Sequence, residues 1–292
     1  MKPALHHQAR MRRVLEHIEH HLHQPLNLDE LSRVAACSKF HFHRQFSATF
    51  GLSVQRYIQL ARMKRASYQL AYRAAHSVTG VALDAGYAAP DAFARAFRQR
   101  FGQSPSSFRL TPHWQPWLAA LEPLNHARST LMHPVYNAND VTIRTVPATP
   151  VGIMSHRGDP ALLGATVQRF IAWRQAAGLH PKNSPTFNVW YSERQPASPD
   201  DYHVDLCAGT RGPIEAHGAE VVAGEIPGGR CAVLRVTGHT DNLEPAALFL
   251  YRDWLPASGE TTRDFPVYCQ RIKFFPEVPE HETVAEVFLP LR

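Results

Sequence analysis

The sequence predicts a two-domain protein, in which an all-α domain with two helix-turn-helix units precedes an α+β domain made of two strand-helix-strand-strand modules. Three observations lead to this prediction. A helical pattern repeats within the first 112 residues, short alternating strands begin after residue 140, and basic residues are concentrated in the first part. We therefore divide the 292 residues into a double helix-turn-helix domain (1–112), a linker (113–140) and a second domain (141–292).

The repeat consists of FHRQFSATFGLSVQRY (42–57) and FARAFRQRFGQSPSSF (93–108), which align at a constant offset of 51 residues. Phenylalanines at i, i+4 and i+8 in each copy form one apolar stripe, which has to face a core. Arg44 and Arg95 lie between the phenylalanines and therefore point outward. Each copy is predicted to be one structural unit built around an amphipathic, basic helix.

The predicted ends of these helices are marked by glycine and serine. Gly51 and Gly102 follow the last phenylalanine and fit the left-handed position that closes a helix. Ser53 and Ser104 then fit the N-cap of the next helix, and Pro105 fits its first turn.

Each basic helix is preceded by a short apolar segment, at 28–36 and at 78–85, and by a tight turn. Short helix, turn and basic helix together make the helix-turn-helix pattern. The segment 53–73 contains neither proline nor glycine and is predicted to be one long connecting helix. Two recognition helices held roughly 34 Å apart would let a monomer read successive major grooves of non-palindromic double-stranded DNA.

Charge is distributed unevenly along the chain. The first 112 residues carry 16 Lys and Arg against 6 Asp and Glu, and the remaining residues carry 15 against 19. This asymmetry indicates that the first part contacts a polyanion. Nine histidines also lie there, and we interpret them as a solvated polar face because no carboxylate or cysteine completes a metal site.

The four cysteines are far apart and show no zinc-site spacing, so we expect reduced thiols, with neither a metal nor a cofactor. The chain has no signal-peptide pattern and no run of about 18 apolar residues. We therefore expect a cytoplasmic, nucleoid-associated protein without a membrane partner.

The first part resembles the DNA-binding domain of the AraC/XylS family of bacterial transcription regulators, over about residues 8–111. The motif GYAAPDAFARAFRQRFGQSPSSFR (86–109) carries the resemblance, together with RMKRASYQLA (62–71). The resemblance implies a DNA-binding transcription regulator that contacts RNA polymerase. A helical bundle with a solvated basic face is the alternative, but such a bundle would not need the repeat.

The resemblance also implies which residues contact DNA. The base-contacting positions correspond to Phe40, His43 and Arg44 in the first unit and to Asp91, Ala92 and Arg95 in the second. The phosphate-contacting positions correspond to Lys39, Ser53, Arg62, Arg65, Arg98, Arg100 and Ser104. Arginine can donate two hydrogen bonds to guanine, and an aromatic ring can contact a thymine methyl group.

The sequence departs from the family pattern at both turns. Cys37 stands where the family usually has glycine. Ala88 and Ala89 precede the second recognition helix, where a capping residue is commoner. Pro90 at the first position of this helix and Asp91 in its first turn partly offset that loss.

The second part is also duplicated. PVGIMSHRGDP (150–160) and CAVLRVTGHTD (231–241) each combine a strand with a turn, and each leads into a helix, expected at about 160–177 and 242–256. The two modules are related by about 80 residues. Two such modules can pair into one curved sheet, with a cleft on the axis between them.

Alternation in the last strand predicts which side chains share a face. Ala285, Val287 and Leu289 suit the face beneath the helices, which leaves Glu286 and Phe288 on the opposite face. A carboxylate between apolar neighbours is unusual in a strand. It indicates either a binding residue or an edge-strand charge that prevents aggregation.

From about residue 141 the chain resembles the GyrI-like, or SbmC-type, effector-binding domain that Rob-like AraC regulators carry. The resemblance rests on YHVDLCAG, IPGGRCAVLRVTGHTD, LYRDWLPASG and ETVAEVFLPL. It implies a glutamate, here Glu286, that faces amphipathic and often cationic ligands in an aromatic cage. The expected ligand-binding residues are Glu286, Trp190, Tyr268 and Phe288, the last standing where relatives often carry tyrosine.

Together these features predict a sequence-specific transcription regulator that responds to a small amphipathic or cationic effector, as multidrug sensors do, and that has no catalytic residue. Two alternatives for the second domain stay open. It could be a protein-interaction module, or a small-molecule hydrolase in which Glu286 acts as the base.

Overall fold

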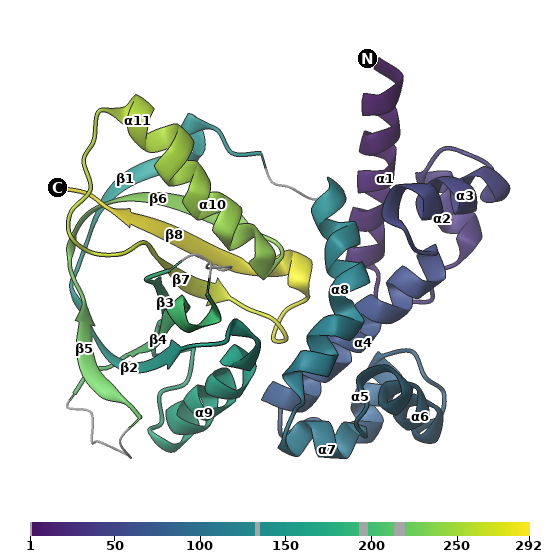
Figure 1. Ribbon diagram of the computed structural model, residues 1–292, viewed down its shortest axis with the longest axis horizontal. Coiled ribbons are helices and arrows are strands. Elements are labelled where there is room, and N and C mark those ends of the chain that lie inside the picture. Colours follow the sequence, from purple (N-terminus) through teal and green to yellow (C-terminus); the bar gives the residue numbers. More distant parts are fainter. Residues whose placement is uncertain (1, 132–134, 193–197, 213–219) are drawn as a thin grey trace. The chain divides into compact units, whose positions relative to one another are not determined.

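The computed structural model in Figure 1 describes residues 2–131, 135–192, 198–212 and 220–292. The chain divides into two compact units, unit 1 (Met1–His133) and unit 2 (Pro134–Arg292). Unit 1 is helical and unit 2 combines a sheet with helices, which confirms the predicted fold class. Within the described ranges, no helix combines the length and the apolar character needed to cross a bilayer.

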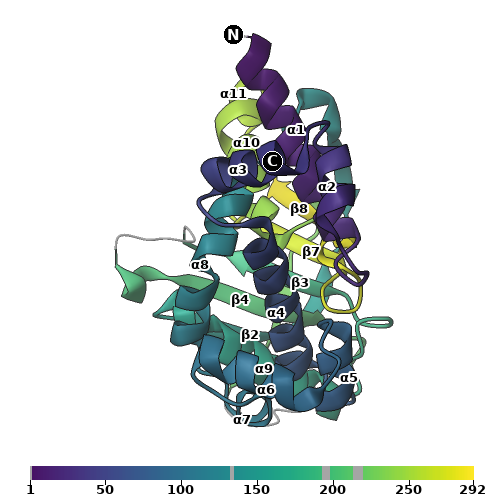
Figure 2. The same ribbon diagram turned by 90° about the vertical axis from the view of Figure 1, so that its right-hand side faces the viewer.

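Unit 1 contains the two predicted helix-turn-helix units. Its helices are α1 (Lys2–His20), α2 (Leu28–Val34), α3 (Lys39–Phe50), α4 (Val54–Tyr72), α5 (Val78–Asp84), α6 (Pro90–Phe101), α7 (Pro105–Leu110) and α8 (Trp114–Leu131). Helices α2 and α3 form the first unit and α5 and α6 the second, and Figure 2 shows α4 running between them. The 19 residues of α4 correspond to a length of about 28 Å.

The predicted helix ends are confirmed. Gly51 and Gly102 have φ values of 71° and 73°, the left-handed conformation that closes a helix. The hydroxyl of Ser53 accepts a hydrogen bond from the Arg56 amide at 3.2 Å, and that of Ser104 accepts one from the Ser107 amide at 3.1 Å.

The repeated phenylalanine stripe forms the core of each helix-turn-helix unit. All six of its residues are at most 2% exposed: Phe42, Phe46, Phe50, Phe93, Phe97 and Phe101. The middle ring of each stripe meets an aromatic ring of the following helix edge-on, Phe46 with Tyr57 and Phe97 with Phe108. The two copies therefore bury equivalent side chains in equivalent ways.

Helix α8 occupies most of the predicted linker and packs within unit 1. The indole of Trp117 donates a hydrogen bond to the Ser67 hydroxyl at 2.6 Å, and the ring of Trp114 stacks on Tyr72. Residues 132–134 of that linker lie outside the described residues.

A buried ionic network joins three helices of unit 1. The guanidinium of Arg128 on α8 donates to Glu19 on α1 at 2.7 Å, and the Tyr57 hydroxyl on α4 donates to the same carboxylate at 2.6 Å. Burial raises the pKa of Tyr57 well above its ordinary value, with the Glu19 charge adding to the effect. Helix α8 is thus fixed to the frame that carries both helix-turn-helix units.

Unit 2 forms one antiparallel sheet in the order β1-β6-β8-β7-β3-β4-β2-β5. Its strands are β1 (Val141–Val146), β2 (Thr149–Arg157), β3 (Thr186–Trp190), β4 (His203–Gly209), β5 (Val222–Ile226), β6 (Gly229–Thr237), β7 (Tyr268–Lys273) and β8 (Val284–Pro290). The two predicted modules join where β3 pairs with β7. Each edge strand belongs in sequence to one module and pairs with the other, β1 with β6 and β5 with β2.

Helices cover one face of this sheet. Helix α9 (Leu163–Ala176) packs on β2 and β4, and α10 (Leu243–Phe249) packs on β6 and β8. A π-helical segment (Leu250–Trp254) leads from α10 into α11 (Leu255–Ser258). The apolar cluster on this side contains Ala285, Val287 and Leu289, as the alternation predicts.

The opposite face, which we call the inner face, has a separate apolar cluster around Phe187, Val189, Tyr268 and Phe288. These residues are at most 6% exposed although no described helix contributes to their cluster, because the sheet curls around them (Figure 1).

The turn before β2 and the turn before β6 approach each other closely at Ala148 and Gly228. A Cβ atom on Gly228 would lie only 2.5 Å from the Ala148 nitrogen, so this approach requires glycine.

Candidate functional site

The exposed faces of α3 and α6 form the candidate DNA interface. Phe40, His43 and Arg44 are exposed on α3, and Asp91 and Arg95 are exposed on α6. Ala92 is half-buried. The predicted base-contacting residues thus lie beside the phenylalanine stripe and outside the core that it forms.

The predicted contact residues of α3 interact with one another. Phe40 is 65% exposed, an unusually high value for a phenylalanine. The guanidinium of Arg44 lies over its ring, 5.0 Å from the centroid. This pair offers a DNA groove an apolar ring and a cation side by side.

The predicted phosphate contacts differ in their surroundings. Lys39 is exposed and forms an ion pair with Asp29, and Arg98 is exposed on α6. Arg65 is half-buried on α4. Arg100 donates to the Gln59 side chain at 3.2 Å, and burial and the nearby Arg56 charge lower its pKa.

Arg62 has a structural environment that differs from the prediction. Its Nε donates to the Leu22 carbonyl at 2.9 Å and its Nη2 to the Gln24 carbonyl at 2.6 Å. Its guanidinium also lies against Gly86, where a Cβ atom would be 2.7 Å from Nη1. Arg62 therefore fixes the loop before α2 to the turn of the second unit, and we do not include it in the DNA interface.

The turn of the first unit corrects the sequence alignment. The alignment puts the family's glycine position at Cys37. In the structure, the residue with a positive φ is Ala36, at 51°. Gly86 takes the corresponding place in the second unit, with φ 84°. The turns therefore align at an offset of 50 residues and the recognition helices at 51, which an alignment with one constant offset misses.

Glu286 is the centre of the candidate ligand site on the inner face. Its side chain is 14% exposed and lies between two guanidinium groups. Arg144 Nη2 donates to Oε2 at 2.6 Å, and Arg235 Nη1 donates to Oε1 at 3.3 Å. Since β8 lies between β6 and β7, Glu286 is on a central strand, and the interpretation of an edge-strand charge is wrong.

Two parallel aromatic rings lie beside this carboxylate. Phe288 and Tyr268 stack with centroids 4.8 Å apart and an angle of 2° between the ring planes. The guanidinium of Arg144 lies 5.7 Å from the centroid of Phe288, so it contacts both the carboxylate and the ring. Cation-π attraction and ion pairing therefore act on the same group.

Tyr268 also contacts other residues of the inner face. Its hydroxyl lies 3.8 Å from the Cys231 sulfur, and the rings of Phe187 and Phe265 meet it edge-on. Burial raises its pKa strongly.

Trp190 lies on the other side of the sheet. It packs against the apolar cluster beneath α10, together with Leu250 and Trp254. Alternation along β3 puts Val189 on the inner face and Trp190 on the helix side. The prediction that Trp190 joins Glu286 therefore fails on geometry.

No local sequence pattern marks Arg144 or Arg235 as a partner of Glu286. Arg235 is the cross-strand partner of Glu286, and Arg144 is separated from it by 142 residues. The contact depends on the order β1-β6-β8, which local pattern does not specify.

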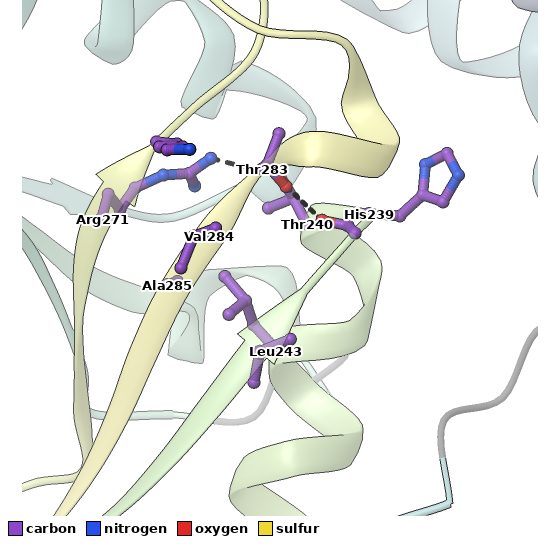
Figure 3. Close-up of a pocket in the computed structure, with 10 residues that line it drawn as sticks. His239, Thr240, Leu243, Arg271, Thr283, Val284 and Ala285 are labelled. Atoms are coloured by element: carbon purple, nitrogen blue, oxygen red, sulfur yellow. Dashed lines mark hydrogen bonds between the residues drawn. The ribbon is translucent and has the colours of Figure 1, made fainter. Parts of the chain in front are cut away.

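A small hollow on the helix side of the sheet, shown in Figure 3, is separate from this site. Thr240, Leu243, Arg271, Thr283 and Ala285 contribute to its wall. Arg271 donates to the Thr240 hydroxyl at 3.2 Å. None of the described residues that line the hollow is a carboxylate, so it does not provide the predicted cation site.

Comparison with known families identifies both units. Residues 139–292 match the GyrI-like small-molecule-binding domain, and residues 31–111 match a helix-turn-helix domain of the AraC type. The chain belongs to the GyrI-like family. It is a DNA-binding transcription regulator with a GyrI-like ligand-binding domain.

Individual relatives agree with this assignment. The chain is 36% identical over 153 residues to the probable transcriptional regulator YgiV of Escherichia coli K12, a match that covers 52% of this chain and 96% of that protein. It is 33% identical over 104 residues to the right origin-binding protein of Escherichia coli K12, covering 36% of each chain.

The chain aligns with a cryo-EM structure of the EcmrR–DNA complex over 91% of its own length and 98% of the length of that protein. Its sequence identity is 12% and its TM-score is 0.45, too low to support an argument about function.

The buried thiols of unit 2 provide a test of its closure: Cys207 and Cys231 lie in the apolar cluster of the inner face, and Cys269 lies in the cluster beneath the helices. Cys207, Cys231 and Cys269 are buried, whereas Cys37 is half-exposed. Burial raises the pKa of Cys269 to about 11 and that of Cys207 further, so both stay protonated and unreactive at pH 8. We expect Ellman's reagent to titrate one thiol rapidly in the native protein and four in urea.

The Cys37→Ser variant is the control and should show no rapid reaction. Fast labelling of Cys207 or Cys231 in the native protein would mean that the inner face is open.

Proposed function

We propose that this regulator reads two successive major grooves of a non-palindromic DNA site and responds to an amphipathic organic cation bound beside Glu286. One observation supports the choice of an organic cation as the ligand. The protein's own Arg144 guanidinium lies between the Glu286 carboxylate and the Phe288 ring.

The DNA part of the proposal rests on the frame of unit 1. The two exposed basic helices belong to units at opposite ends of α4, whose length is about 28 Å. Successive major grooves on one side of a duplex recur about every 34 Å. A helix without glycine or proline cannot bend easily, so the spacing is set by the chain itself.

The ligand class follows from the two contacts of Arg144, one with the Glu286 carboxylate and one with the Phe288 ring. A carboxylate in a poorly solvated site, next to a flat ring, attracts a cation through both Coulomb and cation-π terms. A ligand cation would take the place of the guanidinium, over the face of the Phe288 ring that Arg144 covers. Arg144 is 45% exposed and can move into solvent without leaving a buried charge behind.

The two alternative functions of unit 2 find less support. Both oxygens of Glu286 are held by guanidinium groups, so neither is free to take a proton from a substrate. Phe288 and Tyr268 are at most 3% exposed and do not present an apolar surface to a protein partner. Ligand binding explains both features, and we propose that the protein is not an enzyme.

The position of Arg144 also suggests how binding is transmitted. It lies on β1, an edge strand whose one partner among the described strands is β6, and β1 follows in sequence the segment that joins the two units. Release of Arg144 would therefore loosen the strand closest along the chain to unit 1. Contact with RNA polymerase stays a prediction that the family resemblance implies.

Replacing Arg44 with alanine should weaken binding to a cognate duplex, selected from random sequences, by about 1 to 3 kcal/mol, the value of a bidentate base contact. The measurement is fluorescence anisotropy across a salt series. The variant should also distinguish the selected site from mutated sites less well than the wild type does. Arg12→Ala on α1, where the arginine pairs with Glu16 at the surface, is the matched control. Unchanged affinity in the Arg44 variant would remove α3 from the interface.

For the ligand, calorimetry with tetraphenylphosphonium should show that Glu286→Gln weakens binding more than tenfold and that Arg144→Gln strengthens it by about tenfold, the size of one cation-π contact. Arg235→Gln is the control for charge, because Arg235 contacts Glu286 and does not cover Phe288. Weaker binding by the Arg144 variant would contradict the proposal that the guanidinium competes with the ligand.

A further inference from the structure

The exposed faces of α3 and α6 differ in size and charge, although the buried faces of the two helices are equivalent. At the offset of 51 residues, Phe40 of α3 corresponds to Asp91 of α6. His43 likewise corresponds to Ala94. Phe40 is 65% exposed and carries the Arg44 guanidinium over its ring, whereas Asp91 is an exposed carboxylate. The two units therefore present different chemistry to the grooves that they enter.

Small side chains flank Asp91 on α6. Ala88 and Ala89 are exposed immediately before the helix, and Ala92, which follows Asp91, is half-buried. Each of these alanines ends in a methyl group, and Pro90, the first residue of α6, is compact as well. An aspartate side chain has a single methylene, so it reaches a base edge only where the helix backbone lies close to the bases. The flanking alanines permit that approach.

Asp91 and Arg95 share the exposed face of α6. They lie one turn apart, with the acid on the N-terminal side, an arrangement that allows an ion pair along a helix. On α1, Arg12 and Glu16 have the same spacing and do pair, at 3.7 Å. Among the described residues, however, neither Asp91 nor Arg95 has an ion-pair or side-chain hydrogen-bond partner. Both charged groups are therefore available to an external partner.

Stabilisation of the helix end explains Asp91 only in part. Helix α6 begins without a side-chain cap at Ala89, and a carboxylate in the first turn interacts favourably with the helix dipole. The neighbouring helices α3, α5 and α7 use serine caps instead, at Ser38, Ser77 and Ser104. A serine cap stabilises a helix end without a negative charge. A carboxylate on a face that enters DNA is repelled by the phosphates, so a base has to supply a compensating donor.

Cytosine is the base that a carboxylate recognises best in the major groove. Its N4 amino group donates there, whereas O6 and N7 of guanine and O4 of thymine accept. Adenine donates from N6, but its N7 acceptor lies alongside and faces the second carboxylate oxygen unfavourably. The N-terminal residues of a recognition helix contact base edges, and Asp91 is the second residue of α6.

We infer that Asp91 accepts a hydrogen bond from the N4 amino group of a cytosine, so that the second half of the DNA site requires this base at one position. The inference rests on the proposed function for the entry of α6 into the major groove. Arg95 lies four residues further on, about 6 Å along the helix, and reaches a base about two steps away. The second unit thus reads its groove with short, charged side chains, and the first unit reads its groove with an aromatic ring and a cation.

The test is selection of duplexes from random sequences by the full chain, followed by fluorescence anisotropy on duplexes that differ only at the assigned position. We expect the wild type to select cytosine there and to bind the thymine duplex about tenfold more weakly, because O4 would face the carboxylate. Asp91→Asn should select adenine instead, since an asparagine amide pairs with N6 and N7. Asp91→Ala should bind the four duplexes with affinities that agree within about threefold, because a methyl group makes no hydrogen bond.

Glu16→Gln is the control for charge, because it removes a carboxylate from α1 and should leave every base preference unchanged. Unchanged preferences in the first half of the site show that the Asp91 variants are folded. If Asp91→Asn lowers the melting temperature but selects the same bases as the wild type, Asp91 only stabilises the helix end and the inference is wrong, while the proposed function stands. Failure of the wild type to select any sequence would overturn both.

Discussion

Burial of the repeated phenylalanine stripe is the constraint on which the DNA-binding half of this protein depends. The three phenylalanines of α3 are each at most 2% exposed, and the equivalent residues of α6 are buried in the same way. A helix fixed by three rings on one side has to present its other side to solvent. Arg44 and Arg95 face outward for this reason, and α4 fixes how far apart the two basic faces lie.

Unit 2 is also built from a duplicated element, a strand-helix-strand-strand module. Two modules share one sheet, and the exchange of edge strands leaves each module incomplete without the other. The inner face is buried by rolling of the sheet, so its polar groups need partners. Glu286 obtains them from Arg144 and Arg235, and Asp205 accepts a hydrogen bond from the Ser155 hydroxyl.

Features that follow from local chemistry could be predicted from the sequence. The helix ends at Gly51 and Gly102 and the alternation of β8 depend on neighbours within a few residues, and the structure confirms them. Features that need tertiary register could not. The Arg144 contact joins residues 142 positions apart, and the side of the sheet taken by Trp190 depends on how β3 joins β7.

The most direct test of the central claim is hydroxyl-radical footprinting of the full chain on a selected high-affinity duplex. Two helices on one rigid frame should protect two unequal windows on one side of the duplex, about 10 base pairs apart, with no dyad relating the strands. Protection that is symmetric about a dyad, or limited to a single window, would contradict the claim that one chain reads two successive grooves.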